Sequence, residues 1–154
     1  MTLAFVPASA TALETWATSG VLPGAHIALA VTPALVEAFG FTGVEDEAAE
    51  HEVLCEASAA ALAAHGRRLV VVAEVAVEPT SDIFGRVRVR DVPYDAVISI
   101  FRDDAASTAA AEVAPNVHGL TLEQVLDRVD VQRLLSTTEL LWYGPSEWPE
   151  AIAD

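Results

Sequence analysis

Three strand-like segments follow one another between residues 69 and 101, and this run constrains the fold more than any other feature of the chain. Residues 69–77 (LVVVAEVAV) are rich in valine and predict a central strand. Residues 86–92 (RVRVRDV) alternate polar and apolar side chains, which indicates a strand with one solvated face. Residues 95–101 (DAVISIF) predict a further strand. Consecutive strands without intervening helices favour the α+β class, with an antiparallel or mixed sheet.

The other elements fit one domain around this sheet. Apolar runs at residues 2–6 and 25–31 predict two more strands, and residues 139–143 (ELLWY) are compatible with a strand or a final helical turn. Helices are expected over residues 9–20, 32–40, 45–65 and 103–113, and in two pieces within 121–135. Residues 1–154 are therefore expected to form a single α+β domain, with a mixed, mostly antiparallel sheet of about five strands covered by helices and an irregular C-terminal tail from about residue 144.

Several helix starts carry capping signals. Ser9 or Thr11 is expected to cap the first helix, and Thr121 with Gln124 has the spacing of a capping box. The helix expected from residue 45 opens with acids, Glu45 among them, which favour the positive end of a helix dipole. Asp103 and Asp104 follow a strand and are expected to cap the next helix. Paired carboxylates in this place are also a pattern that binds magnesium, although capping is the favoured interpretation.

The charge of the chain excludes several classes of partner. Acidic residues outnumber basic ones 23 to 8, for a formal net charge of −15. Such a surface repels phosphate backbones and anionic lipid, so we expect neither nucleic acid nor membrane as a partner. No apolar run is long enough to cross a bilayer, and the first residues lack the charged region of a signal peptide. The single cysteine, Cys55, cannot form an internal disulfide, which favours a cytoplasmic location.

Four motifs, taken in order, resemble those of a known family. They are FVPAS at residues 5–9, AVTPAL at 30–35 before an acidic helix, SIFRDD at 99–104, and ELLWY at 139–143 with Glu147 shortly after. The chain resembles an uncharacterised family of small acidic proteins from actinobacteria, a domain of unknown function. The resemblance implies a cytosolic protein from a high-GC Gram-positive source, and it carries over no catalytic or binding residues.

Motifs for nucleotide or serine-hydrolase chemistry do not occur in the sequence, which has no Walker A loop, no GxGxxG and no GxSxG. His51 and Cys55 lie four residues apart on one helix face, a spacing that suits two zinc ligands or a cysteine nucleophile with its base. No other histidine or cysteine has a spacing that would complete a zinc site. The negative charge of the neighbouring glutamates disfavours the thiolate form that a cysteine nucleophile needs. We therefore expect Cys55 to be a small core residue, and we predict no catalytic residue, cofactor or metal.

Two surface features are candidate interaction sites. Arg86, Arg88 and Arg90 lie on one face of the alternating strand, where they either bind an anionic ligand or acidic partner, or neutralise neighbouring acids and protect an edge. The C-terminal segment gathers large side chains typical of interfaces, namely Trp142, Tyr143, Glu147 and Trp148. The alternative for this segment is that its rings fold back onto the sheet as part of the core.

These features favour a non-catalytic cytosolic protein that binds another protein or a second copy of itself as a homodimer. The alternative is a small-ligand-binding domain or small enzyme, with a pocket walled by Trp16, Trp142 and Tyr143 near the C-terminal aromatic segment. A pocket that gathers those residues favours the alternative, whereas an apolar surface patch favours protein binding.

Overall fold

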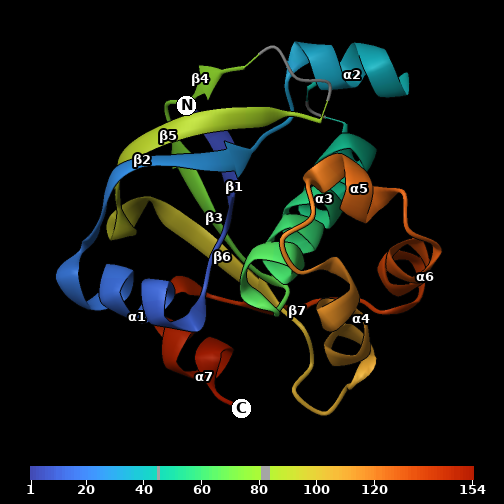
Figure 1. Ribbon diagram of the computed structural model, residues 1–154. Coiled ribbons are helices and arrows are strands. Elements are labelled where there is room, and N and C mark those ends of the chain that lie inside the picture. The colour runs from blue at the N-terminus through green and yellow to red at the C-terminus, as the bar shows by residue number, and fades with distance from the viewer. Residues whose placement is uncertain (45, 81–83) are drawn as a thin grey trace.

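The computed structural model describes residues 1–44, 46–80 and 84–154. Within these residues the chain forms one antiparallel sheet and seven α-helices, which confirms the predicted α+β class (Figure 1). The strands are β1 (Thr2–Pro7), β2 (Val21–Leu29), β3 (Leu69–Val75), β4 (Glu78–Pro79), β5 (Arg86–Pro93), β6 (Val97–Arg102) and β7 (Leu141–Tyr143). The helices are α1 (Ala10–Ser19), α2 (Pro33–Phe39), α3 (Glu47–His65), α4 (Ala109–Val117), α5 (Leu122–Leu126), α6 (Val129–Thr137) and α7 (Trp148–Ile152).

The sheet is larger than predicted, with seven strands in the order β4-β5-β2-β1-β3-β6-β7. One additional strand, β4, is a two-residue pairing with β5, and residues 81–83 between these two strands lie outside the described residues. The ELLWY motif supplies the other, β7, which pairs antiparallel with the end of β6. For residues 139–143 the structure thus decides for the strand over the helical turn. Strand β4 is too short for a local pattern to identify it, because its hydrogen bonds form with β5 elsewhere in the chain.

Strand β2 also begins earlier than the predicted range of 25–31. It starts at Val21 and crosses an irregularity between Leu22 and Ala25, where Gly24 has a φ of +82°. The Gly24 amide donates to the Asp91 carboxylate of the neighbouring strand at 2.7 Å. Proline and glycine at residues 23 and 24 suggest a turn, but here they form a bulge within a continuing strand.

Helices cover both faces of the sheet (Figure 1). The first, which we call the α1 face, packs against α1 and α7 and buries side chains such as Val71 and Val89. The second, the α3 face, packs against α3 with α4, α5 and α6 behind it, and buries Val70 and Val72. Since successive strand residues point to opposite faces, the continuous apolar run of β3 supplies both cores.

The first and third helices begin close to their predicted positions. Ser9 caps α1 by accepting a hydrogen bond from the Ala12 amide, so the cap is Ser9 rather than Thr11. Asp46 caps α3, and Glu45, which was expected to open this helix, lies outside the described residues. Thr121 and Gln124 form the predicted capping box of α5.

Helix α4 differs from the expectation of a helix capped by Asp103 or Asp104. It begins at Ala109, after Thr108, and it continues to Val117, past the expected end at residue 113, with Pro115 inside it. Asp104 instead accepts from the Ala106 amide in a turn before the helix. Asp103 is unavailable as a cap because it forms an ion pair with Arg68. A proline in the last turn removes one helical hydrogen bond, because it has no amide proton, but the two residues after it remain in the helix.

The C-terminal segment contains regular structure where an irregular tail was expected. A 3₁₀ turn, η2 (Pro145–Glu147), leads directly into α7. Pro145 and Pro149 occupy first-turn positions of these two elements, where a missing amide proton costs nothing. Buried Arg102 donates to the Ala151 and Ala153 carbonyl oxygens at the end of α7, which satisfies acceptors that a short helix leaves open.

A buried ion pair joins three segments that are distant in the sequence. Arg68, which follows α3, is only 2% exposed. Its Nε donates to the Asp103 Oδ1 at 2.9 Å, and its Nη2 donates to the Thr138 carbonyl at 3.0 Å. Because Asp103 follows β6 and Thr138 precedes β7, this one guanidinium connects the end of α3, the end of β6 and the entry to β7.

We predict that Asp103→Asn lowers the free energy of unfolding by about 3 kcal/mol, because it leaves the buried Arg68 charge without its counter-charge. The neighbouring Asp104→Asn is the matched control, and we expect it to cost about 0.5 kcal/mol because Asp104 is exposed. Urea denaturation at neutral pH measures both values. Equal losses for the two variants would show that the ion pair does not hold these segments together.

Candidate functional site

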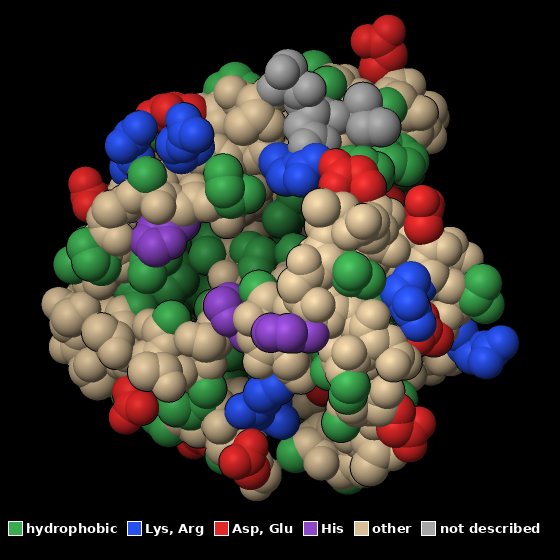
Figure 2. Space-filling view, viewed as in Figure 1, with side chains coloured by type: hydrophobic (Ala, Val, Ile, Leu, Met, Phe, Trp, Pro, Cys, Tyr) green, Lys and Arg blue, Asp and Glu red, His purple; other side chains and the backbone are tan. Residues whose placement is uncertain are grey.

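The arginines of β5 lie beside acidic residues. Arg90 Nε is 3.0 Å from Glu78 Oε1, and Arg88 Nη1 is 4.0 Å from Glu78 Oε2. Arg86 forms an ion pair with Glu123 of α5. Figure 2 shows basic side chains next to acidic ones along the top of this view, where Figure 1 places β5. These pairs support the interpretation that the arginine stripe neutralises neighbouring acids. Binding of an anionic partner there stays a prediction.

The three aromatic residues proposed to wall a common pocket are not brought together. Trp16 is 1% exposed within the α1-face core, and its Nε1 donates to the Val92 carbonyl at 2.9 Å. Trp142 pairs across strands with Phe101, which belongs to the α3-face core, so the Trp142 side chain lies on the α3 face. Tyr143 is the next residue and packs on the α1 face. Alternation along β7 therefore separates these rings.

Within the C-terminal aromatic segment, the four candidate residues have different surroundings. Trp142 is 61% exposed. Tyr143 and Trp148 are half-buried and pack against the α1-face core. The Glu147 carboxylate accepts from the Gly144 amide at 2.8 Å and so closes the turn after β7. Trp142 is thus the large aromatic side chain of this segment that faces solvent.

An apolar groove lies on the α3 face and includes Phe101, the cross-strand neighbour of Trp142. We call it the α3 groove, and its floor and walls are formed by Leu3, Phe5, Leu54, Val72, Ile98 and Phe101. Its volume is about 400 Å³, and Glu47, Glu50 and His51 from the first turns of α3 stand beside it. A second hollow of about 450 Å³ shares Leu3, Phe5 and Glu50 with it and continues towards Val31 and Val44.

Sequence reasoning did not identify the α3 groove, because its residues come from four separate elements. Ile98 is 45% exposed in a run, DAVISIF, that reads as a fully buried strand. The β3–β6 register shifts between Val72 and Ala73, opposite Ile98, so the side chain is displaced from regular alternation. An exposed apolar residue at a bulge is the feature that could have indicated the groove. A bulge cannot be predicted from one segment, because it depends on the register with the partner strand.

His51 and Cys55 do share a helix face, with Nε2 3.6 Å from Sγ. Burial, followed by the negative charge of Glu52, raises the pKa of the Cys55 thiol from 9.0 to about 11. The thiol is therefore protonated at neutral pH and is a poor nucleophile and metal ligand. Among the described residues no cluster of three or more His, Cys, Asp or Glu side chains is arranged to hold a metal ion.

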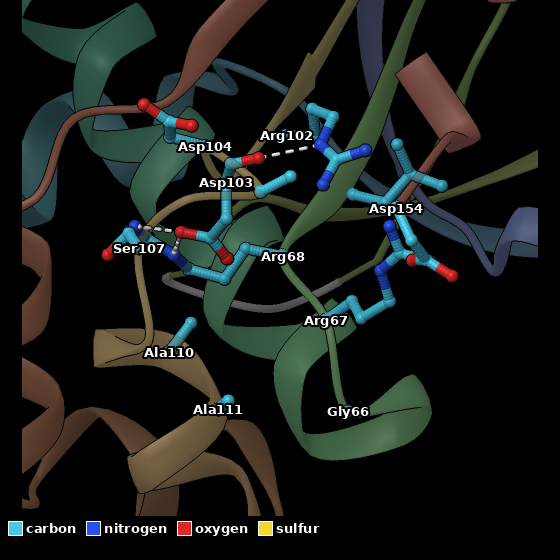
Figure 3. A pocket seen from close by; sticks show the side chains of 12 residues that line it. Gly66, Arg67, Arg68, Arg102, Asp103, Asp104, Ser107, Ala110, Ala111 and Asp154 are labelled. Atoms are coloured by element: carbon cyan, nitrogen blue, oxygen red, sulfur yellow. Dashed lines mark hydrogen bonds and ion pairs between the residues drawn. The ribbon is translucent and has the colours of Figure 1, made fainter. Parts of the chain in front are cut away.

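A smaller cavity of about 230 Å³ gathers three of the arginines near Asp103 and Asp104 (Figure 3). Each guanidinium is already engaged, because Arg68 pairs with Asp103, Arg67 lies 3.4 Å from Asp154, and Arg102 donates to backbone carbonyls. Figure 3 shows the Asp104 carboxylate turned away from that of Asp103. The two aspartates therefore do not converge on one cation.

These features define an α+β protein with an antiparallel sheet, an apolar groove on one face and an exposed tryptophan on an end strand. The chain belongs to the group described as Family of unknown function (DUF6912), whose family model matches residues 2–152. This match confirms the expected membership of a family of unknown function. No curated protein and no solved structure shows a significant match. None of the helices in the described part of the chain is long and apolar enough to cross a membrane.

We predict that native Cys55 reacts with iodoacetamide at pH 8 roughly 100-fold more slowly than the urea-unfolded chain, because two pKa units reduce the thiolate fraction by that factor. Since folding raises this pKa, the native state holds the proton more tightly, and stability falls as the pH rises from 9.0 towards about 11. Mass spectrometry of the alkylated protein gives the rates, with Cys55→Ser as the blank. A native rate equal to the unfolded rate would restore Cys55 as a candidate nucleophile.

Proposed function

We propose that this protein is a non-catalytic binding protein that recognises another protein through the α3 groove and Trp142. The observation that carries the proposal is the exposure of Trp142, at 61%, on a strand at the end of the sheet. A large aromatic ring that remains in solvent is costly to the isolated protein and is typical of an interface anchor. Phe101 connects this ring to the groove, because it pairs with Trp142 and also lines the groove.

The extent of the apolar surface also supports binding of a protein segment. Ile98 of β6 is 45% exposed and lines the α3 groove. Ile98 and the other apolar residues of the groove lie on the α3 face, as does Trp142, and exposed apolar surface of this kind in soluble proteins commonly marks an interaction site. The single free cysteine, Cys55, is in keeping with a reducing compartment such as the cytoplasm.

A different protein suits this surface better than a second copy of the same chain. Each copy carries a formal charge of −15, and Glu47 and Glu50 stand beside the groove. Bringing two such faces together adds like charges at the contact, which opposes association. The preferred occupant is therefore a partner of another sequence.

We expect the purified protein to be a monomer in light scattering at physiological salt, because of this repulsion. Measurement at higher salt concentration, which screens the repulsion between copies, is the second condition, because a dimer is then easier to detect. A dimer that Trp142→Ala dissociates would instead make a second copy the occupant of this surface.

We predict that Trp142→Ala reduces capture of a stoichiometric partner at least tenfold, since interface anchors commonly contribute 2 kcal/mol or more. Ile27→Ala is the matched control: Ile27 is 49% exposed on β2, and three strands separate β2 from β7. The captured partner is then purified, and hydrogen exchange of the complex is measured, where amide protection at residues 141–143 is expected. A partner retained equally by wild type, Trp142→Ala and Ile27→Ala would contradict the proposal.

A further inference from the structure

The acidic side chains beside the α3 groove lack ion-pair partners in the described part of the chain. Glu47 is exposed and Glu50 is half-buried, and both belong to the first turn of α3. Neither carboxylate has a basic side chain within ion-pair distance among the described residues. By contrast, Glu78, Glu123, Asp103 and Asp130 each pair with an arginine. The groove thus presents uncompensated negative charge next to an apolar floor.

No arginine lines either hollow of this surface. Three of the eight arginines surround the cavity near Asp103, and three lie on β5. His51 of α3 lines the groove together with Glu47 and Glu50. An arginine or lysine for these carboxylates is therefore expected from the occupant of the groove.

We infer that the partner segment recognised by the α3 groove is both apolar and cationic, with lysine or arginine placed to meet Glu47 and Glu50. This inference rests on the proposed function and adds the chemical class of the partner. Apolar side chains fill the floor between Phe5 and Phe101, while the cationic groups stay at the wet edge near α3. Complementary charge at such an edge speeds encounter and selects the partner, and the apolar contacts supply most of the affinity.

The position of the acids strengthens this choice over an acidic or neutral segment. Glu47 and Glu50 lie in the first turn of α3, where acidic side chains interact favourably with the helix dipole, and both line the groove. An acidic segment in the groove would add like charges near these side chains. A neutral segment would leave the carboxylates partly desolvated without compensation, which lowers affinity.

The test uses two synthetic peptides of equal length, in which leucine alternates with lysine in one and with glutamate in the other. Fluorescence anisotropy of the dye-labelled peptides gives their affinities for the wild-type protein. We expect the lysine peptide to bind and the glutamate peptide not to bind, and we expect binding to weaken as salt is added. The double variant Glu47→Gln/Glu50→Gln should weaken the lysine peptide roughly threefold to tenfold, the range for two partly exposed charge pairs.

The matched control is Glu14→Gln/Glu150→Gln, which removes the same net charge from exposed positions on α1 and α7, on the opposite face. We expect this variant to bind the lysine peptide within twofold of wild type. Equal weakening by both double variants would mean attraction to overall charge and would overturn the inference. So would failure of the lysine peptide to bind.

The outcomes also separate the inference from the proposed function. If both peptides bind equally and Trp142→Ala abolishes binding of both, the groove binds apolar segments and only the cationic class is wrong. If partner capture does not depend on Trp142, the proposed function itself fails, whatever the peptides do. Circular dichroism of each variant establishes that the substitutions, all at exposed or half-exposed positions, leave the fold intact.

Discussion

The requirement that β3 be covered on both faces determines the arrangement of the whole chain. Its residues from Leu69 to Ala73 are all buried, so neither face of the sheet centre is left to water. Burial of apolar surface is the main favourable term in folding, and it places α1 and α7 on one face and α3 on the other. Strand β7, at one end of the sheet, receives less cover, and Leu141 and Trp142 of this strand are exposed.

Polar interactions then fix how the chain enters and leaves that sheet. Arg68 holds Asp103 and the Thr138 carbonyl, while Arg102, one residue before Asp103, holds the end of α7. A buried guanidinium needs acceptors on several sides, and here each acceptor belongs to a different segment. The same two arginines therefore position β7 and, with it, the exposed ring of Trp142.

The proposed binding surface follows from the way α3 packs on the sheet. Helix α3 lies across the sheet and leaves a groove between its first turns and β6. Acids at the start of a helix stabilise the helix, and at this place they also stand beside the groove. One set of residues thus serves both local stability and the charge of the proposed site. Six of the eight arginines, by contrast, form ion pairs elsewhere in the described part of the fold.

The sequence alone determined the α+β class, most strand and helix positions, and the capping box at Thr121, because these depend on residues that are neighbours in the chain. The exposed position of Trp142, the pairing of Asp103 with Arg68 and the existence of the α3 groove were decided only in the tertiary structure. Each depends on contacts between residues at least 35 positions apart or on the register between strands. Local patterns of side chains contain no information about which distant segment supplies the partner, since that choice is made by how the whole chain buries its apolar surface.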